Sequence, residues 1–136
     1  MMDPSRAEEV QAELLRAEKS LDAARSLLEN DFLEDALSRA YYSILHAARA
    51  VLLAEGVNVS SHRAVRRLFG QYLIKSGKLA VRLAKILAEE QDDRFLADYD
   101  AWFHAERERA EKRVGEAAEF LAVITTFLKG QAPPDA

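Results

Sequence analysis

The segment SRAYYSILHAARAVLL, residues 38–53, contains four polar side chains that a helix would bring into one row. Arg39, Tyr42, His46 and Arg49 recur at intervals of three and four residues, which is the spacing of one helical face. Two guanidinium groups, a phenol and an imidazole in a row could bind a phosphodiester and move a proton beside it. The simpler interpretation is a solvated face that packs on a neighbouring helix or subunit, because any surface helix shows such a stripe.

The segment DDRFLADYDAWFH, residues 92–104, contains a second group of candidates. Arg94 and Asp98 are four residues apart and Tyr99 follows them, so the arginine could hold a phosphate while the phenol donates a hydrogen bond. In the simpler interpretation Arg94 and Asp98 form an ordinary ion pair on a helix surface. Tyr99 and Trp102 then fill the core.

A short basic patch opens the helix expected after residue 61. His62, Arg63, Arg66 and Arg67 are spaced so that they lie on neighbouring turns. Such a patch attracts RNA or an acidic partner, although a solvated face that balances nearby carboxylates has the same composition. His62 could simply extend the helix cap and contact a neighbouring turn.

Paired carboxylates raise one further enzyme class. Acidic residues at 89–93 and at Glu116 and Glu119 resemble the spacing by which helical nucleotide pyrophosphatases hold magnesium. The pairs are imperfectly arranged, and acidic helix faces are the norm in a chain this charged. No Glu-x-x-His sequence occurs, which excludes the usual di-iron bundle site.

Length, charge and composition limit the remaining classes. The 136 residues match one domain, which we place at 1–130 with a disordered tail at 131–136. There is no cysteine, so disulfides, thiolate catalysis and cysteine-bound metals are excluded. No apolar run approaches the roughly 18 residues of a membrane span. The net charge of −4 argues against a surface dedicated to coating nucleic acid, although a local basic stripe can still hold a few phosphates.

The hydrophobic pattern predicts helices that position these side chains. Apolar residues recur at three and four positions, and no window alternates as a strand does. Short polar connections then imply an all-α, up-and-down bundle in which the first and last helices pack along their length. The fourth helix could be two helices with a bend near 91–93. The expected helices span about 4–29, 32–56, 62–77, 79–99 and 101–130.

Three blocks in this order resemble the small stand-alone HEPN proteins of bacteria and archaea. They are YYS-x-x-HAARA-x-LL, SH-x-x-V-x-x-x-F and R-x-x-ADY, and the resemblance covers nearly the whole chain. It implies a four- or five-helix up-and-down bundle that forms a homodimer with a cleft between protomers. Many such proteins are paired with a minimal nucleotidyltransferase as toxin and antitoxin.

The resemblance also implies a chemistry. In active members an Arg, four to six residues and a His form a metal-independent ribonuclease site shared by both protomers. Arg39 and His46 have this spacing, but the family motif lies later in the chain, at the position of Arg94, where Tyr99 stands in place of the His. The motif is therefore either displaced or substituted. A non-catalytic nucleotide-binding or protein-interaction module of the same fold is the alternative.

The expected site and partners follow from these blocks. We expect no cofactor and no metal, a homodimer in the cytoplasm, a nucleotidyltransferase antitoxin, and RNA or a nucleotide as ligand, with neither DNA nor a membrane. The candidate catalytic residues are Arg39, His46, Arg94 and Tyr99, and the candidate ligand or phosphate contacts are Tyr42, Arg49 and Asp98.

Overall fold

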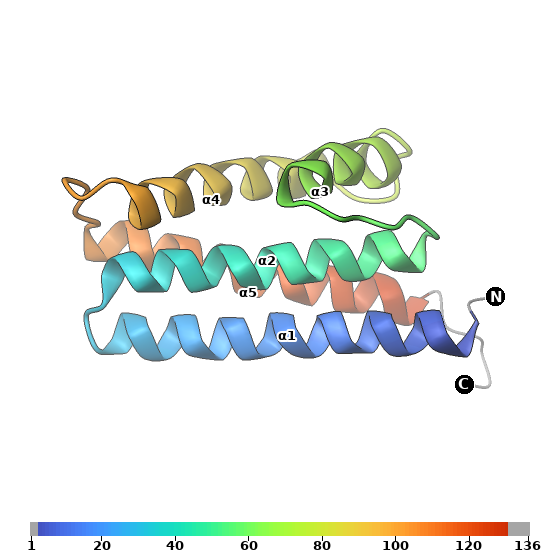
Figure 1. Cartoon of the computed structure of the whole chain (residues 1–136), viewed down its shortest axis with the longest axis horizontal. Coiled ribbons are helices and arrows are strands. Elements are labelled where there is room, and N and C mark those ends of the chain that lie inside the picture. The colour runs from blue at the N-terminus through green and yellow to red at the C-terminus, as the bar shows by residue number, and fades with distance from the viewer. Residues whose placement is uncertain (1–2, 131–136) are drawn as a thin grey trace.

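The structure is a computed structural model that describes residues 3–130, and every regular element in this range is helical (Figure 1). The all-α class predicted from the sequence is confirmed. The expected tail at 131–136 lies outside the described residues. The elements are α1 (Pro4–Glu29), α2 (Leu33–Ala54), α3 (His62–Phe69), the π-helical turn η1 (Gly70–Ile74), α4 (Val81–Tyr99) and α5 (Arg107–Gly130).

Local signals account for most helix ends. The Asp3 side chain accepts a hydrogen bond from the Arg6 backbone N–H at 2.9 Å, and the Ser61 hydroxyl caps α3 through Ala64 N–H at 3.1 Å. Gly56, with φ of 83°, reverses the chain after α2 in a conformation that few side chains tolerate. These boundaries agree with the sequence prediction.

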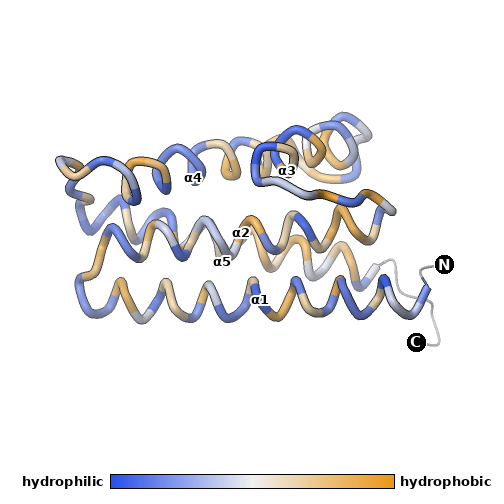
Figure 2. The backbone as a smooth tube through the Cα atoms, in the orientation of Figure 1, coloured by the Kyte–Doolittle hydropathy of each residue, from blue (hydrophilic) through white to orange (hydrophobic). Residues whose placement is uncertain are grey.

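The α2 helix occupies the centre of the bundle, with α1 below it, α4 above it and α5 behind it in Figure 1. Its small residues Ala40, Ala47 and Ala48 are completely buried, which lets neighbouring backbones approach closely. Ser43 donates a hydrogen bond to the Ala17 carbonyl at 2.8 Å and thereby joins α2 to α1. Hydrophobic and hydrophilic residues alternate along the helices, as amphipathic packing requires (Figure 2).

The predicted contact between the first and last helices is present, but it is not the main contact of either helix. The apolar stripe of α1 packs mainly on α2, and α1 shares a smaller contact with α5. The short turn at 30–32 makes α2 the antiparallel neighbour of α1. The apolar surface of α2 is also wide enough that α1, α4 and α5 all pack on it.

The last helix begins later than its apolar pattern indicated, at Arg107 instead of residue 101. The Asp100 side chain accepts the Trp102 N–H at 2.9 Å, and the Ala105 N–H donates to Glu34 at 2.9 Å. An aspartate that binds the backbone two residues on favours a turn over a helix. Phe103 therefore lies in a loop, half-buried. The third helix was expected to run to residue 77, but α3 ends at Phe69, where η1 begins. The fourth helix could have been two helices, and α4 is one continuous helix.

A buried charged network joins α4 to α5. Asp93 accepts hydrogen bonds from Arg109 at 3.0 Å and from Arg113 at 2.6 Å, and Arg113 also donates to Glu116 at 2.8 Å. Burial opposes ionisation of Asp93, but the two guanidinium groups outweigh it and lower its pKa. Burial, together with the nearby Glu116 charge, raises the pKa of Glu90 to about 10.

These contacts bear on the magnesium hypothesis. Arginines bind Glu89, Asp93 and Glu116. Residues 3–130 contain no group of three or more His, Asp or Glu side chains placed to hold a metal ion. We therefore propose no magnesium chemistry for these carboxylates. Within the same range no helix is long and apolar enough to cross a membrane.

Candidate functional site

Arg94 brings together the two groups of candidate residues that the sequence separates. From α4, its Nη2 donates a hydrogen bond to the hydroxyl of Tyr42 on α2 at 3.3 Å, although these residues are 52 positions apart. Its Nε lies 3.4 Å from the Asp98 carboxylate. The predicted ion pair of Arg94 and Asp98 is thus present within α4. The same arginine also joins α4 to α2 through Tyr42.

The Arg94 guanidinium is enclosed by aromatic rings. It lies over the rings of Tyr41, Tyr42 and Tyr99, at 5.4, 5.6 and 5.8 Å from their centroids. Its side chain is only 15% exposed. Cation–π contacts and the Tyr42 bond hold the guanidinium in a fixed position. A fixed, partly desolvated cation binds an incoming phosphate more strongly than a mobile surface arginine does.

His46 is oriented by a residue that the sequence did not indicate. Its Nδ1 lies 2.7 Å from the Glu13 carboxylate of α1, and Arg49 approaches the same carboxylate at 3.6 Å. Burial would raise the pKa of Glu13, but His46 and Arg49 outweigh this effect and lower it. The ionised carboxylate accepts a hydrogen bond from Nδ1–H, which leaves Nε2 available for proton transfer. No local pattern marks Glu13, because the contact depends on how α1 packs on α2.

His62 joins the site from the start of α3. Its ring lies against those of Tyr41 and Tyr42, with centroids 6.2 and 5.9 Å apart. Burial, and then the positive charges of Arg94, Arg49 and His46, lower its pKa below the ordinary value of 6.5. The imidazole is therefore mostly neutral at pH 7 and can accept a proton. The sequence placed His62 in a basic patch, and the SH-x-x-V block was the signal that could have assigned it to the site.

Arg39 lies at the edge of this arrangement. Its guanidinium stacks on the ring of Tyr42 at 5.0 Å from the centroid, and it lines an open pocket with Arg16 and Lys19 of α1. His46 lies seven positions further along α2, which is roughly 10 Å along a helix axis. Arg39 and His46 therefore share a helix face but make no direct contact with each other among the described residues.

Tyr99 and Trp102 do not fill the core, so that part of the simpler interpretation is wrong. Tyr99 is 68% exposed and Trp102 is 90% exposed. The α4 helix ends at Tyr99, and the Asp100 side chain holds the turn that follows by accepting the Trp102 N–H. The Tyr99 ring covers Arg94 and stacks at an angle on Phe95, 5.1 Å away. Its hydroxyl makes no hydrogen bond among the described residues.

The assembled site is cationic and contains one neutral proton acceptor. Arg94 lies on Tyr41 and Tyr42, and Arg49 is close enough to His62 to lower its pKa. Glu13 and Asp98 offset part of the charge of these two arginines. Such an arrangement suits an anionic ligand whose reaction needs a proton removed beside a phosphate.

Comparison with known proteins gives the family. Residues 10–127 match the HEPN domain. The chain is 38% identical over 122 residues to "Putative toxin MJ0605" of Methanocaldococcus jannaschii, which is 90% of each chain. It is 35% identical to a UPF0332 protein of Gloeobacter violaceus, over 83% of this chain and 90% of the relative. The helical architecture and these matches agree, and the chain belongs to the HEPN family.

Proposed function

We propose that this protein is the toxin-like half of a pair with a nucleotidyltransferase antitoxin, and that it acts in the cytoplasm as a homodimeric, metal-independent RNA endonuclease. Two relatives that are named "Putative toxin" support the biological role. The observation that carries the chemistry is the position of Arg94, fixed on Tyr42 beside the neutral imidazole of His62.

The proposed reaction needs no metal ion. Arg94 and Arg49 bind the phosphodiester, and His62 takes the proton from the ribose 2′-hydroxyl. The 2′-oxygen then attacks phosphorus while the bond to the 5′-oxygen breaks. His46, oriented by Glu13, gives a proton to the leaving 5′-oxygen. The products are a 2′,3′-cyclic phosphate and a free 5′-hydroxyl, so atoms and protons balance.

The test is RNA cleavage in chelator by wild type, His46→Ala and His62→Ala. His104→Ala is the matched control, used at the same oligomer mass as wild type because residue 104 lies in an exposed loop near the proposed dimer contact. We expect each of the first two changes to slow cleavage roughly 100-fold or more, while His104→Ala cleaves like wild type. Because the pKa of His62 is lowered, the rising limb of the wild-type pH–rate profile, along which His62 loses its proton, should have its midpoint below pH 6.5. Equal cleavage by all four proteins, or cleavage only with added magnesium, would contradict the proposed mechanism.

Exposed aromatic rings at one end of the bundle are the expected contact of the proposed homodimer. The loop at 101–106 and the α1–α2 turn lie at one end of the bundle (Figure 1), where Trp102 is 90% and Phe32 is 57% exposed. A second copy could remove these large rings from water, which favours association. We expect dimer mass for the wild type and a shift towards monomer for Trp102→Ser, by sedimentation over a dilution series. Tyr72→Ser, at an exposed ring of η1, serves as control and should remain dimeric.

The antitoxin proposal predicts a cellular result. Expression of the wild type should arrest growth, and co-expression of a nucleotidyltransferase from the same genome should relieve it. The His62→Ala protein should not arrest growth when it accumulates to the same level. Arrest by this variant would separate the toxicity from the proposed proton acceptor.

The non-catalytic alternative rests on Tyr99. At the motif position where active relatives are expected to have His, this residue contributes its ring to the Arg94 enclosure, and a phenol accepts protons poorly near neutral pH. A protein that binds a nucleotide or RNA but leaves RNA intact at every pH tested would establish this alternative.

A further inference from the structure

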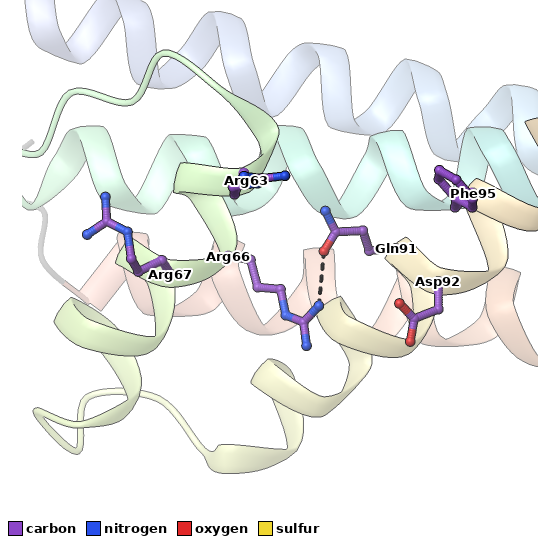
Figure 3. Close-up of a pocket in the computed structure, with 6 residues that line it drawn as sticks. All are labelled: Arg63, Arg66, Arg67, Gln91, Asp92 and Phe95. Atoms are coloured by element: carbon purple, nitrogen blue, oxygen red, sulfur yellow. Dashed lines mark hydrogen bonds between the residues drawn. The ribbon is translucent and has the colours of Figure 1, made fainter.

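We propose that the open pocket between α3 and α4 binds one nucleotide of a single-stranded RNA next to the candidate site. The phosphate would lie on the arginines of α3, and the base would lie on the ring of Phe95. This inference rests on the proposed function, because it identifies the substrate as single-stranded and gives part of its path. The pocket is lined by Arg63, Arg66, Arg67, Gln91, Asp92 and Phe95 (Figure 3).

The arginine side of the pocket lacks compensating carboxylates. Arg63, Arg66 and Arg67 form no ion pair among the described residues, whereas Arg82 and Arg113 are each bound to glutamate. Arg66 instead donates a hydrogen bond to the side-chain oxygen of Gln91 at 3.3 Å (Figure 3). Three unpaired guanidinium groups on two turns of one helix attract an anion and match phosphate geometry.

The α4 side of the pocket has a different chemistry. Phe95 is 59% exposed and stands beside Tyr99, so its face is available for stacking. Asp92 also lies on this side, away from Arg67 (Figure 3). Its carboxylate repels a phosphate but accepts hydrogen bonds from ribose hydroxyls or base amino groups. The pocket thus has an anion-binding side and a stacking side, as a nucleotide requires.

The size and place of the pocket fit one nucleotide of a longer strand. Its volume is about 450 Å³, within the range of ligand sites. Arg66 lies one helical turn after His62, and Phe95 and Arg94 both lie against the ring of Tyr99. A strand whose scissile phosphate lies on Arg94 would therefore place a neighbouring nucleotide in the pocket. An acidic peptide would meet the same arginines but offers no planar base for Phe95.

The experiment measures binding of a 2′-O-methyl oligoadenylate of about ten nucleotides, which cannot be cleaved through its 2′-oxygen. Affinity is determined by fluorescence anisotropy at several salt concentrations, for wild type, the double variant Arg63→Ala/Arg67→Ala, Phe95→Leu, and Arg82→Ala as the control on another face. An abasic strand of the same length reports phosphate binding alone.

Each variant has its own expected result. The double variant should weaken binding of both strands, and the slope of log affinity against log salt should fall by about 1 for each phosphate that is no longer bound. Phe95→Leu should weaken oligoadenylate binding roughly 5- to 100-fold and leave the abasic strand unaffected. Arg82→Ala should match wild type.

Two results would overturn the inference. One is wild-type affinity and salt dependence in both pocket variants. The other is that Phe95→Leu weakens the binding of both strands equally and that polyglutamate competes for the pocket as well as RNA does. The pocket would then be a surface for acidic proteins. Cleavage of ordinary RNA by the same preparations keeps the two proposals separate: binding as expected without cleavage contradicts only the ribonuclease, and cleavage with unaffected pocket variants contradicts only the pocket.

Discussion

Replacing Arg94 by lysine is expected to reduce RNA cleavage at saturating RNA roughly 100-fold or more, the usual effect of losing one donor that stabilises charge in the transition state. Lysine keeps the positive charge but loses the planar group that Tyr41, Tyr42 and Tyr99 enclose. The ammonium group would also be more hydrated and less fixed. The measurement is single-turnover cleavage in chelator, with helicity and oligomer mass checked on the same samples.

Two further variants show whether position matters more than charge. Arg82→Lys makes the same chemical change in an exposed ion pair with Glu119 and should leave cleavage unchanged. Tyr42→Phe keeps the ring beneath Arg94 but removes the hydrogen bond of 3.3 Å, so it should cause a smaller loss than Arg94→Lys. If Arg94→Lys cleaves like wild type while folded, Arg94 does not bind the reacting phosphate.

Replacing Arg113 by methionine is expected to lower the free energy of unfolding by about 3–5 kcal/mol, the cost of leaving buried partners of an ion pair without it. The Arg113 side chain is 10% exposed, and the Asp93 and Glu116 side chains are 4% and 8% exposed. Methionine fills a similar volume, so the loss would report electrostatics more than a cavity. Urea unfolding at pH 7, followed by circular dichroism, measures the change.

The controls for Arg113 separate burial from charge. Arg82→Met breaks an exposed pair, which water and salt screen, so stability should change little.

Glu90→Gln, in contrast to Arg113→Met, should raise the free energy of unfolding. The pKa of Glu90 is about 10 in the folded protein, above its ordinary 4.5, so wild-type stability falls as pH rises between these values. Glutamine removes this loss.

The advantage of Glu90→Gln should therefore be small near pH 4 and exceed about 1.4 kcal/mol, the equivalent of one pKa unit, at pH 7. A variant that is destabilised equally at both pH values would show that Glu90 is ionised in the folded protein and held by Arg113. Little loss on Arg113→Met would show that Arg109 alone compensates Asp93.

The helices and their caps could be predicted from the sequence because the interactions that decide them are local. The buried face of α2 follows from apolar residues spaced at helical intervals, and the caps at Asp3 and Ser61 act on backbone N–H groups three residues away. The start of α5 could not be predicted in this way. The turn at Asp100 and the bond from Ala105 to Glu34 override its apolar pattern.

The candidate site was only partly predictable, because the sequence shows spacings within one helix but not contacts between helices. The row from Arg39 to Arg49 and the ion pair of Arg94 with Asp98 are spacings within single helices, which the sequence shows directly. It could not show that Tyr99 is exposed, because burial at the end of α4 depends on where the next segment turns.

By itself, then, the sequence determined the helical class, the face of α2 that enters the core, and the residue types available for phosphate chemistry. Only the tertiary structure decided which of them meet. The bond from Arg94 to Tyr42 spans 52 residues and that from His46 to Glu13 spans 33. Such contacts depend on the packing of α1, α2 and α4, and no pattern of nearby residues encodes the distance between side chains on separate helices.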